Sequence, residues 1–234
     1  MTPSPQLLES EKDSKGICCS GIQIENQPQG FYARHGKRVV DCIISAAGLF
    51  VLLPVFALVA VCIKLTSRGQ VLYRQMRVGR GGHPFQIVKF RSMDSVASEM
   101  FPAITVSGDI RITRIGRILR RFKIDELPQL WNVLRGEMSL VGPRPELPKY
   151  VDAYSPEQKR VLCVRPGITD PASLTYRHEE QILSRYEDPE QVYRMQILPD
   201  KLAQNLDYIR AISFWTDLRI IFATVIRSFL HVDS

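Results

Sequence analysis

The sequence predicts an α+β protein that is mainly helical and that places one segment in a membrane. Three observations predict this fold class: an uncharged apolar run at residues 42–63, a strand–turn–strand pattern at residues 71–92, and helical spacing of apolar residues after that. A chain of 234 residues is long enough for one ordinary domain. We therefore expect a flexible tail at residues 1–33, a membrane segment at 34–68 and one folded domain at 69–234.

The apolar run contains 22 residues without a charged side chain. A straight helix of that length reaches about 33 Å, enough to cross a hydrocarbon core of about 30 Å. Pro54, near the middle of the run, removes a backbone hydrogen bond and disfavours a straight helix. Basic residues flank both ends, so the positive-inside rule gives no orientation. On these residues alone, a spanning helix and a re-entrant helix that breaks at Pro54 both stay open.

A small β-hairpin follows the apolar run. Residues 71–78 and 85–92 have the composition of strands, and the GRGGHP between them is rich in turn-forming residues. The two-residue period places four side chains of the second strand on one face: Phe85, Ile87, Lys89 and Arg91.

Helical periodicity dominates the rest of the chain. From Ile112 to Phe122 the apolar residues recur at spacings of 3, 4 and 3, and arginines fill much of the remaining surface, which makes this helix amphipathic. A second helical pattern begins within DELPQLWNVLR, and Gly136 is its expected stop. Short helices interrupted by proline are expected across residues 146–198, and one apolar-rich helix is expected from Asp207 to Leu230.

The charge distribution indicates a phosphate-bearing partner. The net charge is +7, and residues 34–124 carry 16 Lys and Arg against four acidic residues. Nucleic acid, a nucleotide or lipid headgroups would suit this charge, but no nucleic-acid-binding module is recognisable, so nucleic acid is not expected. Five cysteines without a CxxC pair disfavour a disulfide framework or a structural zinc site. The absence of GxSxG and of GxxxxGK[ST] removes serine hydrolases and P-loop proteins.

Asp125 and Glu126 are the first candidate site residues, because six basic side chains precede them within thirteen residues. Arginines can hold phosphates and keep a nearby carboxylate ionised. An aspartate carboxylate can attack phosphorus, while a neighbouring glutamate holds a divalent cation. The alternative is a helix N-cap, which is the commoner role of such an Asp-Glu-x-Pro start when it stands alone.

Three more cations are candidates for binding an anion. Arg144 lies between two prolines, which restrict the backbone around it and hold it ready for a phosphate. Its alternative is a rigid surface turn. Lys89 and Arg91 share a strand face, and the alternative for both is a solvated face without a ligand.

Three stretches (residues 37–54, 71–93 and 109–146, the last containing DELPQLWNVLRGEMSLVGPRPE) resemble the bacterial sugar transferase family, the monotopic phosphoglycosyl transferases. The likeness extends over residues 34–230. It implies a monotopic protein of the bacterial inner membrane, with a re-entrant helix-break-helix at residues 34–68, amphipathic interfacial helices, and residues 69–234 as a catalytic domain on the cytoplasmic face. It thus favours the re-entrant alternative, with the break at Pro54.

The resemblance also implies an activity. A UDP-sugar would donate its sugar 1-phosphate to undecaprenyl phosphate and release UMP, as the first membrane step of an exopolysaccharide, capsule or O-antigen-type glycan. Asp125 would attack the β-phosphate and form a covalent phospho-sugar intermediate, and Glu126 would bind Mg²⁺. The residues implied in substrate binding are Lys89, Arg91, Arg120, Arg144 and Asp217.

The sequence departs from the family pattern at three places. Leu53 and Lys123-Ile124 stand where many members have Ser and Ser-Leu, and DPASLTYRHEE at 170–180 replaces a GLWQVSGR-like run, which leaves the identity of the sugar open. The expected partners are a UDP-sugar, undecaprenyl phosphate and membrane lipids, with a homodimer left open and no nucleic acid. The alternative function is a catalytically inactive membrane-tethered scaffold, against which the intact Asp125-Glu126 pair argues.

Overall fold

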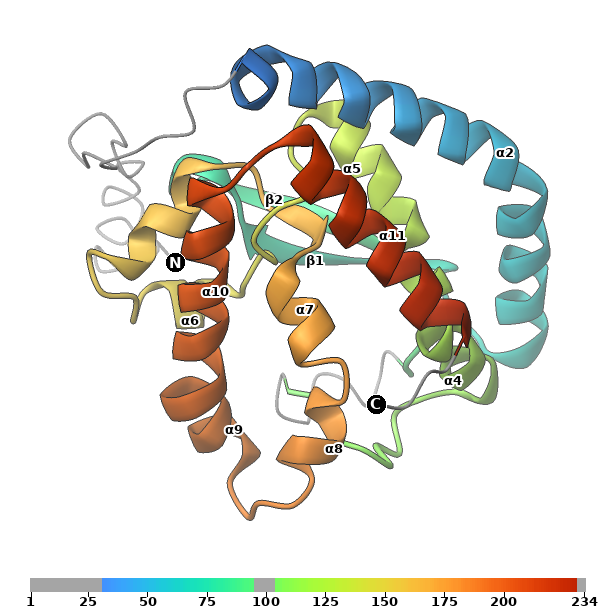
Figure 1. Ribbon diagram of the computed structural model, residues 1–234. Helices are drawn as coiled ribbons and strands as arrows, with labels where there is room; N and C mark the ends of the chain where they lie inside the picture. Colours follow the sequence, from blue (N-terminus) through green and yellow to red (C-terminus); the bar gives the residue numbers. More distant parts are fainter. Residues whose placement is uncertain (1–30, 95–103, 231–234) are drawn as a thin grey trace, which may run out of the picture.

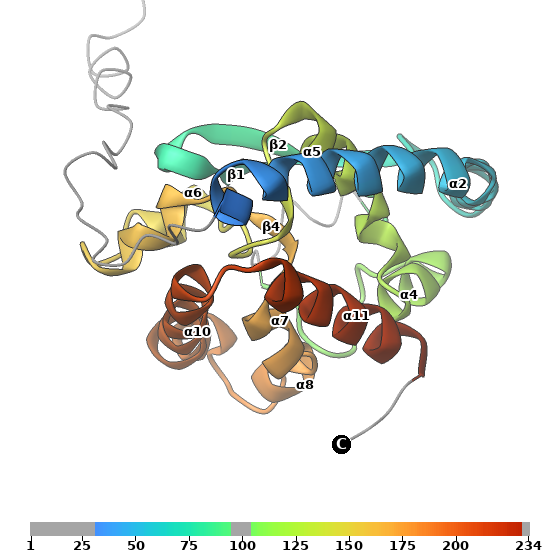
Figure 2. The ribbon, with the colours of Figure 1, turned by 45° about the horizontal axis from the view of Figure 1, so that its top comes forward.

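The computed structural model describes residues 31–94 and 104–230 (Figure 1). Within these residues the chain is mostly helical and has two small two-stranded sheets, which confirms the predicted mainly helical α+β fold. One long helix, α2, arches over the rest of the protein (Figures 1 and 2). Residues 1–30, nearly all of the expected tail, lie outside the described residues, and helical structure begins at Tyr32, just inside the expected tail.

Helix α2 spans Lys37–Thr66 and continues a short π-helical turn, η1, at Tyr32–Gly36. It is long and apolar enough to cross a membrane, and 11% of its most apolar window is buried. The helix stays continuous through Pro54, but its ribbon changes direction about midway (Figures 1 and 2). The expected break is therefore a bend inside one helix, since a proline can kink a helix without ending it.

The apolar side chains of α2 are mostly unpacked. Those more than half exposed are Val39, Ile43, Phe50, Val51, Leu53, Leu58, Val61 and Leu65. A row of eight such side chains in water would be unfavourable, since each buried CH₂ stabilises by about 0.8 kcal/mol.

The first turns of α2 are tied to the domain below by polar groups. Arg38 donates to the carbonyl oxygen of Val133 and, at 2.9 Å, to that of Leu134. It thereby caps the C-terminal end of helix α5 (Leu130–Arg135). Asp41 is buried and accepts from the Ser139 hydroxyl at 2.7 Å. These contacts hold the start of α2 against residues about 100 positions later in the chain.

The predicted hairpin is present. β1 (Leu72–Val78) pairs antiparallel with β2 (Pro84–Phe90), and the turn between them, η2 (Arg80–Gly82), contains two glycines with positive φ. Such backbone favours glycine, which explains the GRGG of the sequence.

Between the hairpin and the second sheet lies the segment that carries the acidic pair. α4 (Arg114–Arg121) is capped by Thr113, whose hydroxyl accepts from the Gly116 amide at 2.9 Å. A 3-10 turn, η3 (Ile124–Gln129), then leads into α5. Gly136 ends α5 with a φ of 84°, as expected from the sequence.

The second sheet is a short parallel pair that the sequence does not predict. β3 (Ser139–Val141) pairs with β4 (Gly167–Thr169), and the crossover between them contains α6 (Pro148–Val151) and η4 (Gln158–Cys163). The chains approach so closely here that a Cβ on Gly167 would lie 2.1 Å from the amide nitrogen of Gly142. This contact fixes the start of the turn that carries Arg144.

The C-terminal part is a series of helices around the core. They are α7 (Pro171–Thr175), α8 (Glu179–Leu183), α9 (Pro189–Val192), η5 (Tyr193–Ile197), α10 (Leu198–Arg210) and α11 (Phe214–Leu230). The prediction of a single helix over Asp207–Leu230 is wrong, because α10 ends at Arg210 and a new helix, α11, begins at Phe214. The Ser213 hydroxyl accepts from the Thr216 amide at 3.1 Å and so starts a new helix.

Candidate active site

Asp125 and Glu126 lie in the tight turn η3, and both are buried, with 5% and 7% of their surfaces exposed. Lys123, directly before this turn, has a φ of 57° and is the one non-glycine residue with positive φ among those that the structure describes. Lys123, and not Asp125, holds the N-cap position of η3. The helix-cap interpretation of Asp125 is therefore wrong, and its burial needs another explanation.

Two cations from distant parts of the chain meet Glu126. Lys89 of β2 lies with Nζ 2.8 Å from Oε1 of Glu126. Arg144, in the turn after β3, donates through Nη1 to Oε2 at 3.2 Å and through Nη2 to Oε1, so that it holds the carboxylate bidentately. The side chains of Lys89 and Arg144 are 18% and 30% exposed, so the cluster opens toward solvent on their side. Neither side chain simply faces solvent, because both are paired with Glu126.

The charges in the cluster set opposite protonation tendencies in the two carboxyls. Burial opposes ionisation of Glu126, yet Arg144 and Lys89 hold the pKa of its carboxyl well below its usual range. Burial, together with the negative charge of Glu126, raises the pKa of Asp125 above its ordinary value. Glu126 is thus the fixed anion of the pair, and Asp125 is the carboxyl whose charge depends on what binds beside it.

Asp125 also has a carboxylate oxygen without a hydrogen-bond partner. Its Oδ1 atom is buried and has no hydrogen-bond partner within residues 31–94 and 104–230. Buried polar atoms are nearly always paired, so the unpaired oxygen of Asp125, next in the chain to the carboxylate that Lys89 and Arg144 hold, is a candidate position for a ligand.

Arg120 and Arg91 do not join this cluster directly. Arg120, at the end of α4, forms an ion pair with Glu180 of α8. Arg91 is buried and donates to the carbonyl oxygens of Ser67 at 3.0 Å and Arg68 at 2.6 Å, where α2 ends. Arg91 thus caps the end of α2, and the substrate contact implied by the resemblance stays a prediction.

Asp217 of α11 belongs to a separate buried cluster. It accepts hydrogen bonds from the hydroxyls of Tyr32 and Tyr208, each at 2.7 Å, and from Lys37. These partners come from η1, α10 and the start of α2. Asp217 therefore ties the N-terminal end of α2 to the C-terminal helices, and its described contacts include no member of the Glu126 cluster.

Asp170 supports the site and was not singled out in the sequence. It is 1% exposed, and its Oδ2 accepts from the backbone amide of Arg144 at 3.2 Å and from Asn205 at 2.8 Å. Its Oδ1 accepts from the Ser173 amide at 2.7 Å, which caps α7. An Asp directly before Pro171 is a helix-start signal, but the hydrogen bond to Arg144 could not be read from the sequence.

Asn132 explains another part of the motif around the acidic pair. Its amide accepts from the Val88 amide at 3.1 Å and donates to the Gln86 carbonyl at 2.7 Å, so it pairs with the backbone of β2 as a neighbouring strand would. It thereby fixes α5, and the η3 turn ahead of it, against the strand that carries Lys89.

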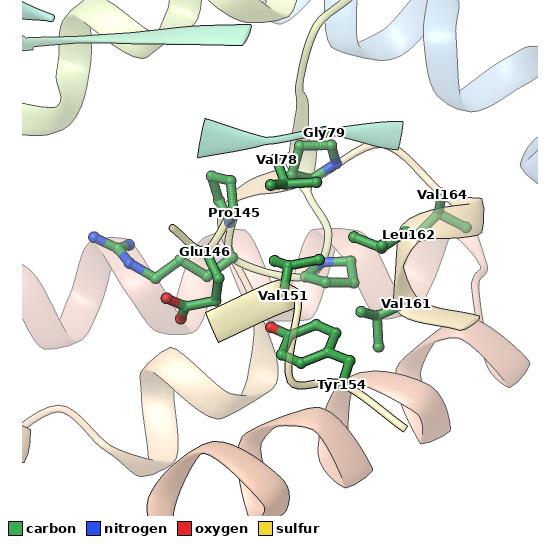
Figure 3. A pocket seen from close by; sticks show the side chains of 12 residues that line it. Val78, Gly79, Pro145, Glu146, Val151, Tyr154, Val161, Leu162 and Val164 are labelled. Carbon is green, nitrogen blue, oxygen red and sulfur yellow. The ribbon is translucent and has the colours of Figure 1, made fainter. Parts of the chain in front are cut away.

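A small cavity lies behind the turn that carries Arg144 (Figure 3). Its walls are mostly apolar and include Val78, Val151, Val161 and Leu162, with Glu146 on one side. It has about 10 Å³ of space for a water molecule, roughly enough for a single one. The cavity therefore backs the turn and is too small for a substrate.

The donor atoms of the site suit a magnesium ion that is shared with a substrate. No group of three or more His, Cys, Asp and Glu side chains with metal-ligand geometry occurs in the described part of the chain. Mg²⁺, however, is commonly bound by one or two carboxylates together with substrate phosphates. Glu126 offers an ionised carboxylate, so it fits such an ion once phosphates supply the remaining ligands.

The cluster contains the parts of a group-transfer enzyme that acts on phosphates: a candidate nucleophile, a second carboxylate and two cations. The chain belongs to the bacterial sugar transferase family, whose model matches residues 32–231, and it is a transferase. This confirms the resemblance seen in the sequence.

Relatives in this family carry related names. A UDP-glucose:undecaprenyl-phosphate glucose-1-phosphate transferase of Caulobacter vibrioides is 43% identical over 201 residues, which cover 85% of this chain and 71% of the relative. A protein of the same name from Klebsiella pneumoniae is 36% identical over 85% of this chain and 41% of its own length. A UDP-N-acetylgalactosamine-undecaprenyl-phosphate N-acetylgalactosaminephosphotransferase of Aeromonas hydrophila is 36% identical over 81% of this chain and 42% of its own length. The chain thus spans less than half of the latter two proteins.

Proposed function

We propose that this protein transfers a sugar 1-phosphate from a UDP-sugar to undecaprenyl phosphate, with Asp125 as the nucleophile, and that UMP is released. The names of the relatives supply the donor and acceptor classes. The observation that carries the assignment to Asp125 is its buried, unpartnered Oδ1, next in the chain to the carboxylate of Glu126 that Lys89 and Arg144 hold. This transfer would be the first membrane step in the assembly of an exopolysaccharide, capsule or O-antigen-type glycan.

The first half of the reaction uses the open oxygen of Asp125. Oδ1 attacks the β-phosphorus of the UDP-sugar, and the bond from that phosphorus to the bridging oxygen breaks. The electron pair stays on the bridging oxygen, which leaves as part of UMP, and the sugar phosphate is left covalently bound to Asp125. An oxygen of undecaprenyl phosphate then attacks the same phosphorus and displaces the carboxylate, which regenerates Asp125.

Lys89 and Arg144 stabilise the charge that moves in both halves. In the free protein both cations face Glu126. A bound diphosphate would draw them away from that carboxylate, because phosphate oxygens accept the same charge-assisted hydrogen bonds. Glu126, kept ionised by its surroundings, would then be available to hold Mg²⁺, and that ion when bound neutralises charge on the phosphates.

We also propose that α2 is re-entrant and that the protein sits on the cytoplasmic face of the bacterial inner membrane. Both ends of α2 contact the same domain, the start through Arg38 and Asp41 and the end through the hydrogen bonds of Arg91 to residues 67 and 68. A helix that crossed the bilayer would place these ends on opposite sides. The bend seen midway along α2 supports a path that enters and leaves the same leaflet (Figure 1).

Helix α11 supplies a second apolar surface for the membrane interface. Four side chains spaced 3, 4 and 3 residues apart lie on its exposed face: Trp215, Leu218, Phe222 and Val225, at 68%, 43%, 65% and 50% exposure. This helical stripe is typical of an interfacial amphipathic helix.

The test of the proposed function is turnover by the purified protein in lipid nanodiscs. UDP-glucose and UDP-N-acetylgalactosamine are supplied in turn with undecaprenyl phosphate and Mg²⁺, and UMP and the lipid-linked sugar are both quantified. Equal amounts of the two products are expected from at least one donor. Failure to form either product from a panel of UDP-sugars would contradict the proposal and favour the inactive scaffold.

A further inference from the structure

Arg120 is held by a carboxylate from a distant helix. Arg120 is the next-to-last residue of α4, five residues before Asp125, and its Nη2 donates to Oε1 of Glu180, 60 residues later on α8. The two side chains are 25% and 43% exposed, so the ion pair lies at the surface of the protein. The backbone carbonyl of Arg120 accepts from the Lys123 amide at 3.1 Å, so the end of α4 adjoins the turn η3 that carries the acidic pair.

The helix that carries Glu180 is fixed on several sides. Leu183 is fully buried in the core, and Glu179 is ion-paired with Lys201 of α10. The backbone carbonyl of Glu180 accepts from the Ser107 amide at 3.1 Å. Glu180 is thus presented from a rigid base, and the contact with Arg120 orders the arginine more than it orders the glutamate.

The ion pair uses one nitrogen of Arg120. A guanidinium has five N–H donors in one plane, and no other partner of the Arg120 side chain occurs among the described residues. Its remaining donors are therefore available to a ligand. An arginine whose plane is already fixed loses less side-chain entropy when it binds an anion, so its contribution to affinity is larger.

We infer that Glu180 is a positioning residue, which holds the guanidinium of Arg120 in the orientation that binds the diphosphate of the donor nucleotide. This inference rests on the proposed function for the identity of the ligand. The opposite role is a latch, in which Glu180 competes with the diphosphate for Arg120. The two roles predict opposite changes in the Kd of UDP when the carboxylate of Glu180 is removed: a rise for a positioning residue and a fall for a latch.

The experiment compares Glu180→Ala, Glu180→Gln and the control Glu187→Ala in the full-length protein. Glu187 is an exposed carboxylate seven residues later on the same segment, so its loss makes the same change in net charge. Two quantities are measured: the Kd of UDP by titration, which needs no turnover, and the KM and kcat for the donor. The midpoint of thermal unfolding of each variant reports on folding.

For Glu180→Ala we expect about a tenfold rise in the Kd of UDP and in the donor KM, with kcat changed less than about threefold, because one oriented charge-assisted contact is weakened. Glu180→Gln keeps an oxygen acceptor for Arg120 and should stay within about threefold of the wild type. In Arg120→Ala, adding Glu180→Ala should have no further effect, because the two residues act as one unit.

A latch would instead lower the Kd of UDP in both Glu180 variants, and that result would overturn the inference. So would a lower unfolding midpoint without any change in Kd, or effects of Arg120→Ala and Glu180→Ala that simply add. If Glu180→Ala does not fold, Glu180→Gln still decides, since only a latch predicts tighter binding. Wild-type protein that binds UDP but releases no UMP would refute the proposed function separately.

Discussion

Lys89 on β2 and Glu126 in η3 are 37 residues apart in the chain, yet the lysine nitrogen lies 2.8 Å from the carboxylate oxygen. The pairing is possible because Asn132 binds the backbone of β2 and so fixes the segment that carries Glu126 against this strand. A buried ion pair of this kind gives little net stability, because desolvation of both charges offsets their attraction. The pair therefore contributes less through stability than through the phosphate contacts that Lys89 can make in place of Glu126.

The nucleophile assignment predicts that Asp125→Asn abolishes turnover, because an amide does not form the acyl-phosphate. Incubation of the wild type with a UDP-sugar labelled in the sugar, without acceptor lipid, should give protein that carries the label after denaturation. The variant should carry none and should still bind UDP. Full activity in the folded variant would contradict the assignment.

For Glu126→Gln we expect a severe loss of kcat and a weaker dependence on Mg²⁺. The change leaves Lys89 and Arg144 without their carboxylate, so UDP should bind at least as tightly as in the wild type, while the ion loses a ligand. The measurement is the Mg²⁺ concentration at half-maximal rate. An unchanged metal titration would count against a ligand role for Glu126.

For Arg144→Ala we predict a fall in kcat/KM of about 10- to 150-fold, because a charge-assisted hydrogen bond contributes roughly 1.5–3 kcal/mol. The matched control is Arg135→Ala, whose side chain is 59% exposed and pairs with Glu137 at the surface. Surface ion pairs contribute about 0–1 kcal/mol, so the control should change little. Equal effects of the two substitutions would reduce Arg144 to a structural turn residue.

Sequence patterns predicted the elements with strong local signals. The hairpin, the helix that became α4 and the stop at Gly136 follow from turn glycines and a regular apolar period, although α4 begins at Arg114, two residues after the expected start. The pair β3–β4 has three-residue strands, which are too short to show a period, and the break before α11 depends on a single capping serine. Both were therefore missed.

The candidate site shows the same division between local and long-range information. The resemblance pointed to Lys89, Asp125, Glu126 and Arg144, and the structure brings these four together. It could not separate them from Arg91, which caps α2. A residue type at a motif position does not reveal its partner when that partner lies far away in the chain.

Asp217 gives a prediction that separates a structural role from substrate binding. Removal of one partner from a buried ion pair costs roughly 3–5 kcal/mol, so Asp217→Ala should lower the thermal unfolding midpoint by several degrees. The control Asp207→Ala removes a carboxylate that is 74% exposed and should have little effect. Because Asp217 contacts Lys37 and two tyrosines and not the Glu126 cluster, the Kd of UDP in folded Asp217→Ala should match the wild type. A large rise in that Kd at unchanged stability would restore the substrate-binding interpretation.

The last prediction concerns the path of α2. In a variant without native cysteines, single cysteines are introduced by His35→Cys and Gln70→Cys, two exposed positions just outside the ends of this helix. If α2 enters and leaves the same leaflet, both cysteines should resist an impermeant thiol reagent in intact cells and react after lysis. A spanning helix would leave one of them reactive in intact cells, and that result would refute the re-entrant path but not the proposed reaction.

Pro54→Leu supplies the missing backbone donor and removes the ring that bends the helix, so it should favour a straight span. We expect this change to expose His35→Cys to the reagent in part of the population and to lower activity, because the contacts of Arg38 and Arg91 at the two ends can no longer form together.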